Sequence, residues 1–203
     1  MDQSLLETCR VLPVVTAIDV ESTVQLTRTL AAGNMLAVEI TLRTEAALDS
    51  IREVKAQVPD MLVAAGTVTN PEDLEAAMKA GADFCVSPGI SAQLLQASRD
   101  MQVDFIPGVA TASEVMLGLE YDCQVFKLFP AVAVGGLSLL KALAGPFPEV
   151  KFCPTGGLTP DNFRDFLALP NVVCCGGSWM VSEKLVGAGR WQEIEQLARE
   201  AMG

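Results

Sequence analysis

Short apolar segments rich in β-branched residues recur eight times along the chain, separated by longer segments with helical periodicity. This alternation is typical of parallel strands joined by crossover helices. Because the apolar segments are nearly continuous, each strand is expected to be buried on both faces. The expected strands cover residues 11–18, 35–42, 61–68, 84–89, 104–109, 124–130, 151–156 and 172–177.

Start and stop signals mark the helical segments. Asn70-Pro71 and Thr159-Pro160 each place a capping side chain before a proline, which is tolerated at the first helical position. A short leading helix is expected at 2–10. Glycine has the freedom to end a helix, and three helices are expected to end at Gly33, Gly81 and Gly145.

The number and spacing of these units favour one fold class. Eight strand-helix units of similar length predict a single (β/α)₈ TIM barrel with a short N-terminal helix, as one domain over residues 1–203. An open, doubly wound sheet is the competing fold. No GxGxxG fingerprint follows the first expected strand, and this favours the barrel.

Composition narrows the range of partners. The net charge of -11 argues against a nucleic-acid-binding surface, which needs clustered Lys and Arg. No apolar run reaches the roughly 18 residues that span a bilayer, so no membrane partner is expected. The first ten residues lack the form of a secretory signal, which predicts a cytoplasmic protein. With 50% hydrophobic residues, an exposed apolar patch for self-association is also expected.

The chain contains no histidine, which excludes an imidazole base or an imidazole metal ligand. Proton transfer must then use a carboxylate, Lys, Cys, Tyr or water. The six cysteines show no CxxC spacing, so they are expected to be reduced thiols, most of them buried, rather than zinc ligands or disulfides. Neither a metal nor another cofactor is expected.

Lys127 lies in the middle of the apolar segment Gln124 to Pro130, and it is the one lysine that interrupts an expected strand. Burial disfavours the charged ammonium, and a neutral amine is a nucleophile able to form a Schiff base with a ketone. The structural alternatives are an ion pair with a carboxylate or a side chain that reaches the rim.

The two-residue period of a strand puts Glu39, Thr41 and Arg43 on one face of the second expected strand. That face must point into the barrel, because the apolar face packs against helices. Glu39 is therefore predicted to share a cavity with Lys127 as an acid-base catalyst, or to neutralise it as a buried salt bridge. The planar guanidinium of Arg43 is suited to bind a carboxylate or phosphate of the ligand through two hydrogen bonds. The alternative is an ion pair between Arg43 and an acidic residue of a loop.

Paired glycines follow the last two expected strands, at Gly156-Gly157 and Gly176-Gly177. Many barrels bind phosphate at this position through backbone N–H groups and a helix N-terminus, although tight turns also use such glycines. Thr155 and Ser178 add hydroxyl groups to these segments. A phosphate site is predicted here.

Seven motifs in order give the chain a close resemblance to the 2-keto-3-deoxy-6-phosphogluconate (KDPG) and 4-hydroxy-2-oxoglutarate (KHG) aldolase family. They span essentially the whole chain and read EITLRT at 39–44, AAGTV at 64–68, SPG at 87–89, IPGVAT at 106–111, FKLFP at 126–130, CPTGG at 153–157 and GGSW at 176–179. The resemblance implies a cytoplasmic, homotrimeric class I aldolase that needs no metal or cofactor and gives pyruvate and glyceraldehyde 3-phosphate. It also implies cleavage of 4-hydroxy-2-oxoglutarate to pyruvate and glyoxylate.

The same resemblance assigns roles to residues. Lys127 takes the Schiff-base role and Glu39 the general acid-base role. The pyruvate portion would contact Arg43, Thr67, Pro88, Phe129 and Thr155, and the phosphate would contact Gly156, Gly157, Gly177 and Ser178.

The chain departs from the family at Val132, where relatives usually carry a glutamate, and this difference bears on substrate preference and local loop structure. Two rival functions remain. A phosphosugar isomerase or epimerase would share the phosphate site but would not need Lys127. A catalytically silent barrel would serve as an oligomeric assembly unit, with Val132 and Val134 extending an association surface.

Overall fold

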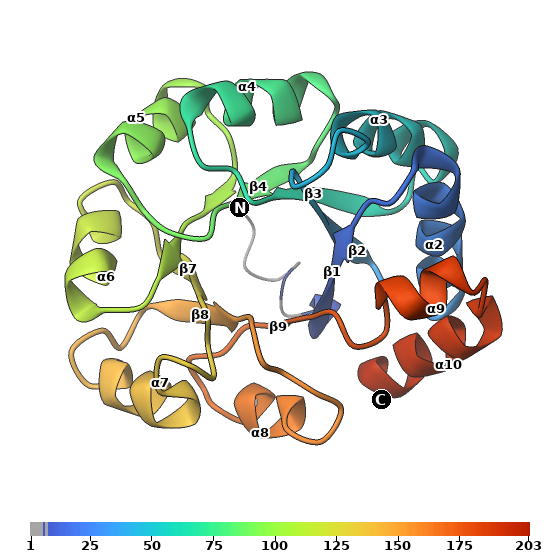
Figure 1. Ribbon diagram of the computed structural model, residues 1–203. Coiled ribbons are helices and arrows are strands. Elements are labelled where there is room, and N and C mark those ends of the chain that lie inside the picture. The colour runs from blue at the N-terminus through green and yellow to red at the C-terminus, as the bar shows by residue number, and fades with distance from the viewer. Residues whose placement is uncertain (1–5, 7) are drawn as a thin grey trace.

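The structure is a computed structural model that describes residue 6 and residues 8–203 (Figure 1). Its strands are parallel and form two sheets. The six-stranded sheet has the order β5 (Phe105–Ile106), β4 (Phe84–Val86), β3 (Leu62–Gly66), β2 (Ala37–Thr41), β1 (Val11–Thr16) and β9 (Cys175–Gly177). The three-stranded sheet has the order β6 (Gly108–Val109), β7 (Val125–Leu128) and β8 (Lys151–Pro154).

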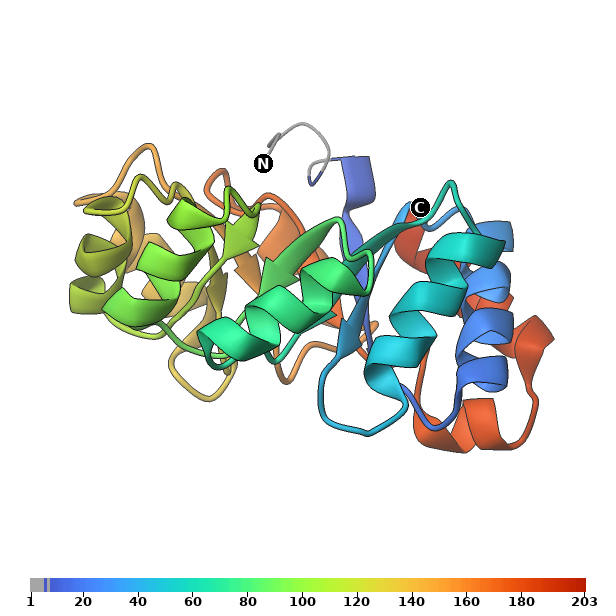
Figure 2. The same ribbon diagram turned by 90° about the horizontal axis from the view of Figure 1, so that it is seen from above.

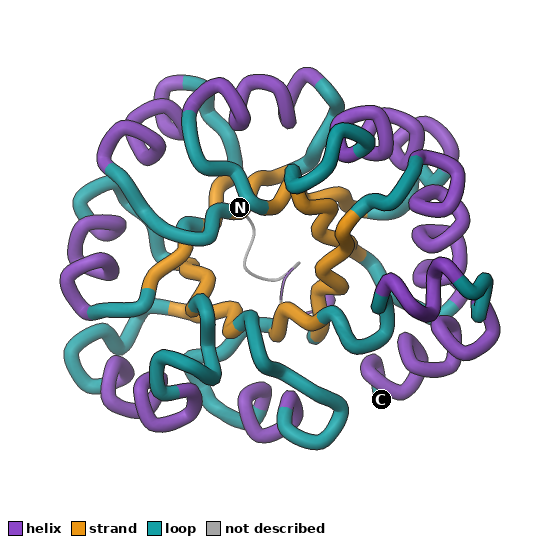
Figure 3. Tube along the Cα trace, in the orientation of Figure 1, coloured by secondary structure: helices purple, strands orange, loops and turns teal. Residues whose placement is uncertain are grey.

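Both sheets curve around a common centre, and the helices lie outside them (Figures 1 and 3). The perpendicular view shows helices flanking the strands (Figure 2). The helices are α2 (Val20–Ala32), α3 (Ala47–Gln57), α4 (Pro71–Lys79), α5 (Ala92–Asp100), α6 (Ala112–Leu119), α7 (Gly136–Ala144), α8 (Phe163–Leu167), α9 (Glu183–Gly187) and α10 (Trp191–Met202). None of the helices described here is long and apolar enough to cross a bilayer.

The predicted alternation of parallel strands and outer helices is confirmed. The hydrogen bonds, however, divide the strands into sheets of six and three instead of one closed sheet of eight. The expected strand 104–109 is divided into β5 and β6 at Pro107, which has no N–H to donate to a neighbouring strand. Two isolated bridges, Phe152 with Val172 and Thr155 with Gly176, connect β8 to the segment around β9.

Most observed strands are shorter than expected. β2, for example, ends at Thr41, and the residues that follow it form a turn. The predicted leading helix 2–10 falls largely on residues 1–5 and 7, which lie outside the described residues. Leu6 and Cys9, which are described, are buried inside the ring of strands.

The helix signals are mostly confirmed. Asn70 caps α4 by accepting a hydrogen bond from the N–H of Asp73 at 2.8 Å, and the three expected glycines lie at or just after helix ends. The expected start at Thr159-Pro160 is wrong. Those residues form a turn in which the Asn162 side chain accepts a hydrogen bond from Thr159 N–H at 2.9 Å, so α8 begins at Phe163.

Two apolar clusters fill the molecule. The larger cluster lies between the strands and the helices and includes Phe126 and Leu128 of β7. The smaller cluster lies inside the ring and includes Leu12, Phe84 and Val125. Burying each such side chain stabilises the fold by about 1.5–3 kcal/mol. Because side chains alternate along β7, Lys127 points to the interior while its two neighbours pack against helices.

Candidate active site

Lys127 and Glu39 form a buried ion pair inside the ring. Lys127 projects from β7 and Glu39 from β2; their side chains are 4% and 1% exposed. Lys127 Nζ donates to Glu39 Oε1 at 3.0 Å and to Oε2 at 3.3 Å. The expected contact between these residues is therefore present. A carboxylate in direct contact with the amine can accept its proton, so the salt bridge and the acid-base arrangement coexist.

Gly66, at the end of β3, has no side chain, and the Glu39 side chain occupies the space next to it. A methyl group at this position would overlap the Glu39 carboxylate at Oε1. β2 and β3 pair so that Thr41 lies beside Gly66. Thr41 Oγ1 in turn donates to the Val15 carbonyl at 3.0 Å, which ties β2 to β1. The strand that carries Glu39 is therefore fixed between neighbouring strands on both sides.

Phe129 and Thr155 flank the amine. The Phe129 ring centroid lies 5.3 Å from Lys127 Nζ, and the peptide bond from Phe129 to Pro130 is cis. Thr155 follows β8, and its hydroxyl lies 3.4 Å from the Cys153 carbonyl. A side chain at Gly176 would overlap the Thr155 hydroxyl, so Thr155 can adopt this position only because residue 176 is a glycine.

Arg43 lies in the turn after β2, not on the strand as expected, and its side chain is exposed. Its Nε donates to Thr67 Oγ1 at 3.1 Å. Within the described part of the chain, no ion pair joins Arg43 to a carboxylate. The expected alternative of a pair with a loop acid is therefore absent among those residues, and the guanidinium keeps donors for another anion.

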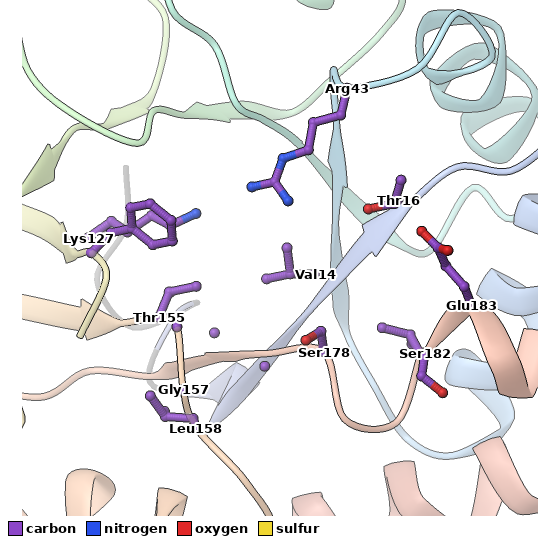
Figure 4. A pocket seen from close by; sticks show the side chains of 15 residues that line it. Val14, Thr16, Arg43, Lys127, Thr155, Gly157, Leu158, Ser178, Ser182 and Glu183 are labelled. Carbon is purple, nitrogen blue, oxygen red and sulfur yellow. The ribbon is translucent and has the colours of Figure 1, made fainter. Parts of the chain in front are cut away.

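A cavity of about 380 Å³ opens above Lys127. In Figure 4, Lys127 and Arg43 point toward its centre from different sides. The two positive-φ glycines after β8, Gly156 (φ +100°) and Gly157 (φ +80°), adopt a turn that other residues rarely accept. The lining residues are Val14, Thr16, Arg43, Lys127, Phe129, Thr155, Gly156, Gly157, Leu158, Gly176, Gly177, Ser178, Val181, Ser182 and Glu183.

Three of the expected site residues are not among the residues that line this cavity. Glu39 and Thr67 do not line it themselves, but each accepts a hydrogen bond from a residue that does, Lys127 and Arg43 respectively. Pro88 lines a separate depression of about 240 Å³ next to Val68 and Gly89. The structure thus brings together the lysine, the arginine and the glycine turns, but leaves Pro88 apart.

Sequence reasoning missed Thr16, Ser182 and Glu183, which line the cavity. Thr16 ends β1, so the rule that barrel sites gather at the carboxyl ends of strands would have found it. Ser182 and Glu183 begin α9 after a loop. No strand-end pattern marks them in the sequence.

The Cys153 thiol lies next to the ion pair, and Cys174 contacts Cys153. Cys153 of β8 is the register partner of Lys127. A hydrogen bond with Cys174 is the main cause that lowers the pKa of Cys153, and the same bond raises the pKa of Cys174 well above its usual value. All six cysteines are free, as expected. Across the described residues, no three His, Cys, Asp or Glu side chains gather in a way that would hold a metal ion.

Residues 2–197 match the family model described as "KDPG and KHG aldolase". The chain belongs to the KDPG and KHG aldolase family. The KHG/KDPG aldolase of Escherichia coli K12 is 47% identical over 200 residues, which cover 98% of this chain and 94% of the relative. The 2-dehydro-3-deoxy-phosphogluconate aldolase of Dickeya dadantii is 46% identical, covering 95% of this chain and 90% of the relative.

A solved member of the KDPG and KHG aldolase family superimposes closely. The KDPG aldolase of Legionella pneumophila, crystallised with pyruvate captured as a covalent carbinolamine intermediate, has a TM-score of 0.96 and 40% identity, covering 98% of this chain and 97% of that one. The KDPG aldolase of Zymomonas mobilis with 3-phosphoglycerate has a TM-score of 0.92 and 40% identity, with coverage of 98% and 94%.

Val132, where the sequence resemblance predicts a departure from the family pattern, packs against the glycine turn. Its side chain would collide with a methyl group at Gly157, and its N–H donates to the Gly156 carbonyl at 3.1 Å. The side chain is 46% exposed. This position therefore supports the turn that lines the cavity.

Proposed function

We propose that this protein is a class I aldolase that cleaves 2-keto-3-deoxy-6-phosphogluconate to pyruvate and glyceraldehyde 3-phosphate. On the same site it cleaves 4-hydroxy-2-oxoglutarate to pyruvate and glyoxylate. One observation carries the proposal: Lys127 Nζ lies 3.0 Å from Glu39 Oε1, beside a cavity that Lys127 lines. A nucleophile and a proton acceptor in direct contact are the parts that Schiff-base chemistry requires.

The first half of the reaction builds an electron sink. Lys127 passes a proton to Glu39, and its neutral amine attacks the C2 ketone of the substrate to give a carbinolamine. Glu39 returns a proton to the departing hydroxyl, and water leaves. The product is a protonated imine between Lys127 and C2.

The second half breaks the C3–C4 bond. Glu39 accepts the proton of the C4 hydroxyl, directly or through a water molecule, and the electrons of the C3–C4 bond move toward the iminium nitrogen. The aldehyde departs and leaves an enamine on Lys127. Protonation at C3 and hydrolysis by water release pyruvate and regenerate the amine. The enzyme uses no cofactor.

The remaining site residues hold the two ends of the substrate. In this proposal Arg43, Thr67, Phe129 and Thr155 form the pyruvate subsite, whereas Pro88 lines a separate depression, and Arg43 binds the carboxylate with its free donors. Gly156, Gly157, Gly177 and Ser178 form the phosphate subsite through backbone N–H groups and a hydroxyl. The turn geometry of Gly156 and Gly157 supports the second assignment.

We infer that the two sheets form one closed (β/α)₈ barrel, as a single domain over residues 1–203. β5 and β6 are separated only by Pro107, and the bridge between Thr155 and Gly176 links β8 to β9. We further propose a cytoplasmic homotrimer. Exposed apolar side chains such as Ile18 and Met116 support self-association. Light scattering at several concentrations would report a mass three times that of one chain, and a monomer would contradict the proposal.

The deciding experiment is reductive trapping. The purified protein is treated with pyruvate and borohydride, digested and examined by mass spectrometry. Reduction of the imine leaves a carboxyethyl group bound irreversibly to Lys127 Nζ, with the ketone oxygen lost as water. An unmodified Lys127, or a label on another lysine, would rule out the Schiff-base mechanism and favour an isomerase or a non-catalytic barrel.

A further inference from the structure

The cavity continues beyond the amine to a polar end formed by the carboxyl end of β1 and the start of α9. Thr16, Ser178, Ser182 and Glu183 line this end, and Figure 4 shows them on the side of the cavity opposite Lys127. Nothing in the reaction proposed above uses Glu183.

Glu183 is distinctive because of its charge. Of the described residues that line the cavity, it alone carries a carboxylate; the other charged side chains, Arg43 and Lys127, are cations. No hydrogen bond or ion pair with another described residue engages the Glu183 side chain. Lys127 is already paired with Glu39, so it does not neutralise Glu183. The polar end of the cavity therefore carries a carboxylate that has no salt-bridge partner among the described residues.

This charge lies in the same cavity as the glycine turns to which a phosphate group is assigned. A bound phosphate monoester carries about -1.5 to -2 charges at neutral pH and is repelled by a nearby carboxylate. The uncharged hydroxyl end of an unphosphorylated sugar acid is not repelled by the carboxylate. Its hydroxyl group donates a hydrogen bond to the carboxylate, and the hydroxyls of Thr16 and Ser182 offer further partners.

We propose that Glu183 is a specificity-determining residue that lowers the preference of the enzyme for phosphorylated substrates over unphosphorylated ones. The substrate class that gains is the 2-keto-3-deoxy sugar acids with a free terminal hydroxyl. The proposal rests on the proposed function and refines it at the distal end of the substrate. The site remains usable by phosphate, since Glu183 is exposed and solvent screens its charge.

The test compares two substrates that differ only in the phosphate, 2-keto-3-deoxy-6-phosphogluconate and 2-keto-3-deoxygluconate. Glu183→Gln removes the charge and keeps the shape. At low ionic strength it raises kcat/KM for the phosphorylated substrate by about threefold, the size expected for one unit of repulsion across several ångströms of a water-like medium. For the unphosphorylated substrate, kcat/KM stays the same or falls. Added salt of about 0.5 M removes most of the gain.

Glu149→Gln is the matched control. It causes the same change in net charge at an exposed residue in the loop before β8, outside the cavity lining. It leaves both kcat/KM values unchanged. A second readout needs no turnover of the phosphorylated substrate: inorganic phosphate inhibits cleavage of 2-keto-3-deoxygluconate more strongly in Glu183→Gln than in the unaltered protein.

The outcomes separate the two proposals. If the unaltered protein cleaves both substrates and Glu183→Gln changes them by the same factor, the role of Glu183 is wrong and the aldolase function stands. An equal gain in the Glu149→Gln control also overturns it, because the effect then comes from overall charge. If neither substrate is cleaved and Lys127 is not trapped with pyruvate, both proposals fail together.

Discussion

The six-stranded sheet contributes Glu39, and Arg43 lies in the turn that follows its strand β2, whereas the three-stranded sheet contributes Lys127. Glu39 and Lys127 lie 88 positions apart in the chain and meet only across the interior of the ring. Neither sheet alone holds both reactive groups. The chemistry therefore depends on how the two curved sheets are held around one centre.

Lys127→Met should have the largest effect, because it removes the reactive group of the three-stranded sheet. Turnover should fall by at least about 10⁴-fold, since no other group at this position forms the imine. Coupled detection of pyruvate measures the loss. Lys151→Met is the control, because Lys151 belongs to the same sheet but donates to the Pro170 carbonyl near the surface. Equal loss in both variants would mean that the sheet, not the amine, had been damaged.

The ion pair should also couple the stability of the two sheets. Lys127→Met alone leaves a buried Glu39 without its partner and should lower the free energy of unfolding by about 3–5 kcal/mol. Adding Glu39→Leu replaces the pair with apolar groups and should recover most of that loss. Urea denaturation of the single and double variants measures both effects. If the double variant is no more stable than the single one, the pair is not coupled across the ring.

Gly66→Ala should disturb the position of Glu39 in the six-stranded sheet and leave Lys127 in the three-stranded sheet in place. The new methyl group would overlap the Glu39 carboxylate, so Glu39 must shift away from Lys127 and turnover should fall about 10- to 100-fold. Borohydride trapping at Lys127 should slow but persist. Gly145→Ala, at the end of α7, meets only ordinary contact with a backbone oxygen 3.9 Å away and should leave turnover unchanged. A normal rate in Gly66→Ala would show that the position of Glu39 is not critical.

The smallest predicted effect concerns two thiols. Burial raises the pKa of Cys85 in β4 to about 12, and burial together with Asp122 raises the pKa of Cys123, just before β7, to about 11. Below these values the reactive thiolate grows tenfold with each pH unit. Iodoacetamide should therefore label the partly exposed Cys123 about tenfold faster at pH 9 than at pH 8, while the buried Cys85 stays unlabelled. Peptide mapping measures the labelling of each cysteine. Labelling of Cys85 with Cys123 left unlabelled would contradict the prediction.

Periodicity in the sequence predicted the parallel strands, the outer helices and the contact between Glu39 and Lys127. These features follow from burial, which leaves a direct pattern along the chain. The division at Pro107 was not predicted, because the missing N–H matters only once neighbouring strands are known. Arg43 was placed on a strand that ends two residues earlier. Glu183 was missed because it follows a loop, and nothing in its local sequence points to the cavity.

The near-complete burial of Lys127 also protects the protein from its own reactivity. A neutral amine in open solution condenses with many aldehydes and ketones, including reducing sugars. With 4% of its side chain exposed, Lys127 reacts only with carbonyl compounds that enter the cavity and place their carbonyl carbon next to Nζ. The burial that places the amine beside Glu39 therefore also limits its condensation with other carbonyl compounds.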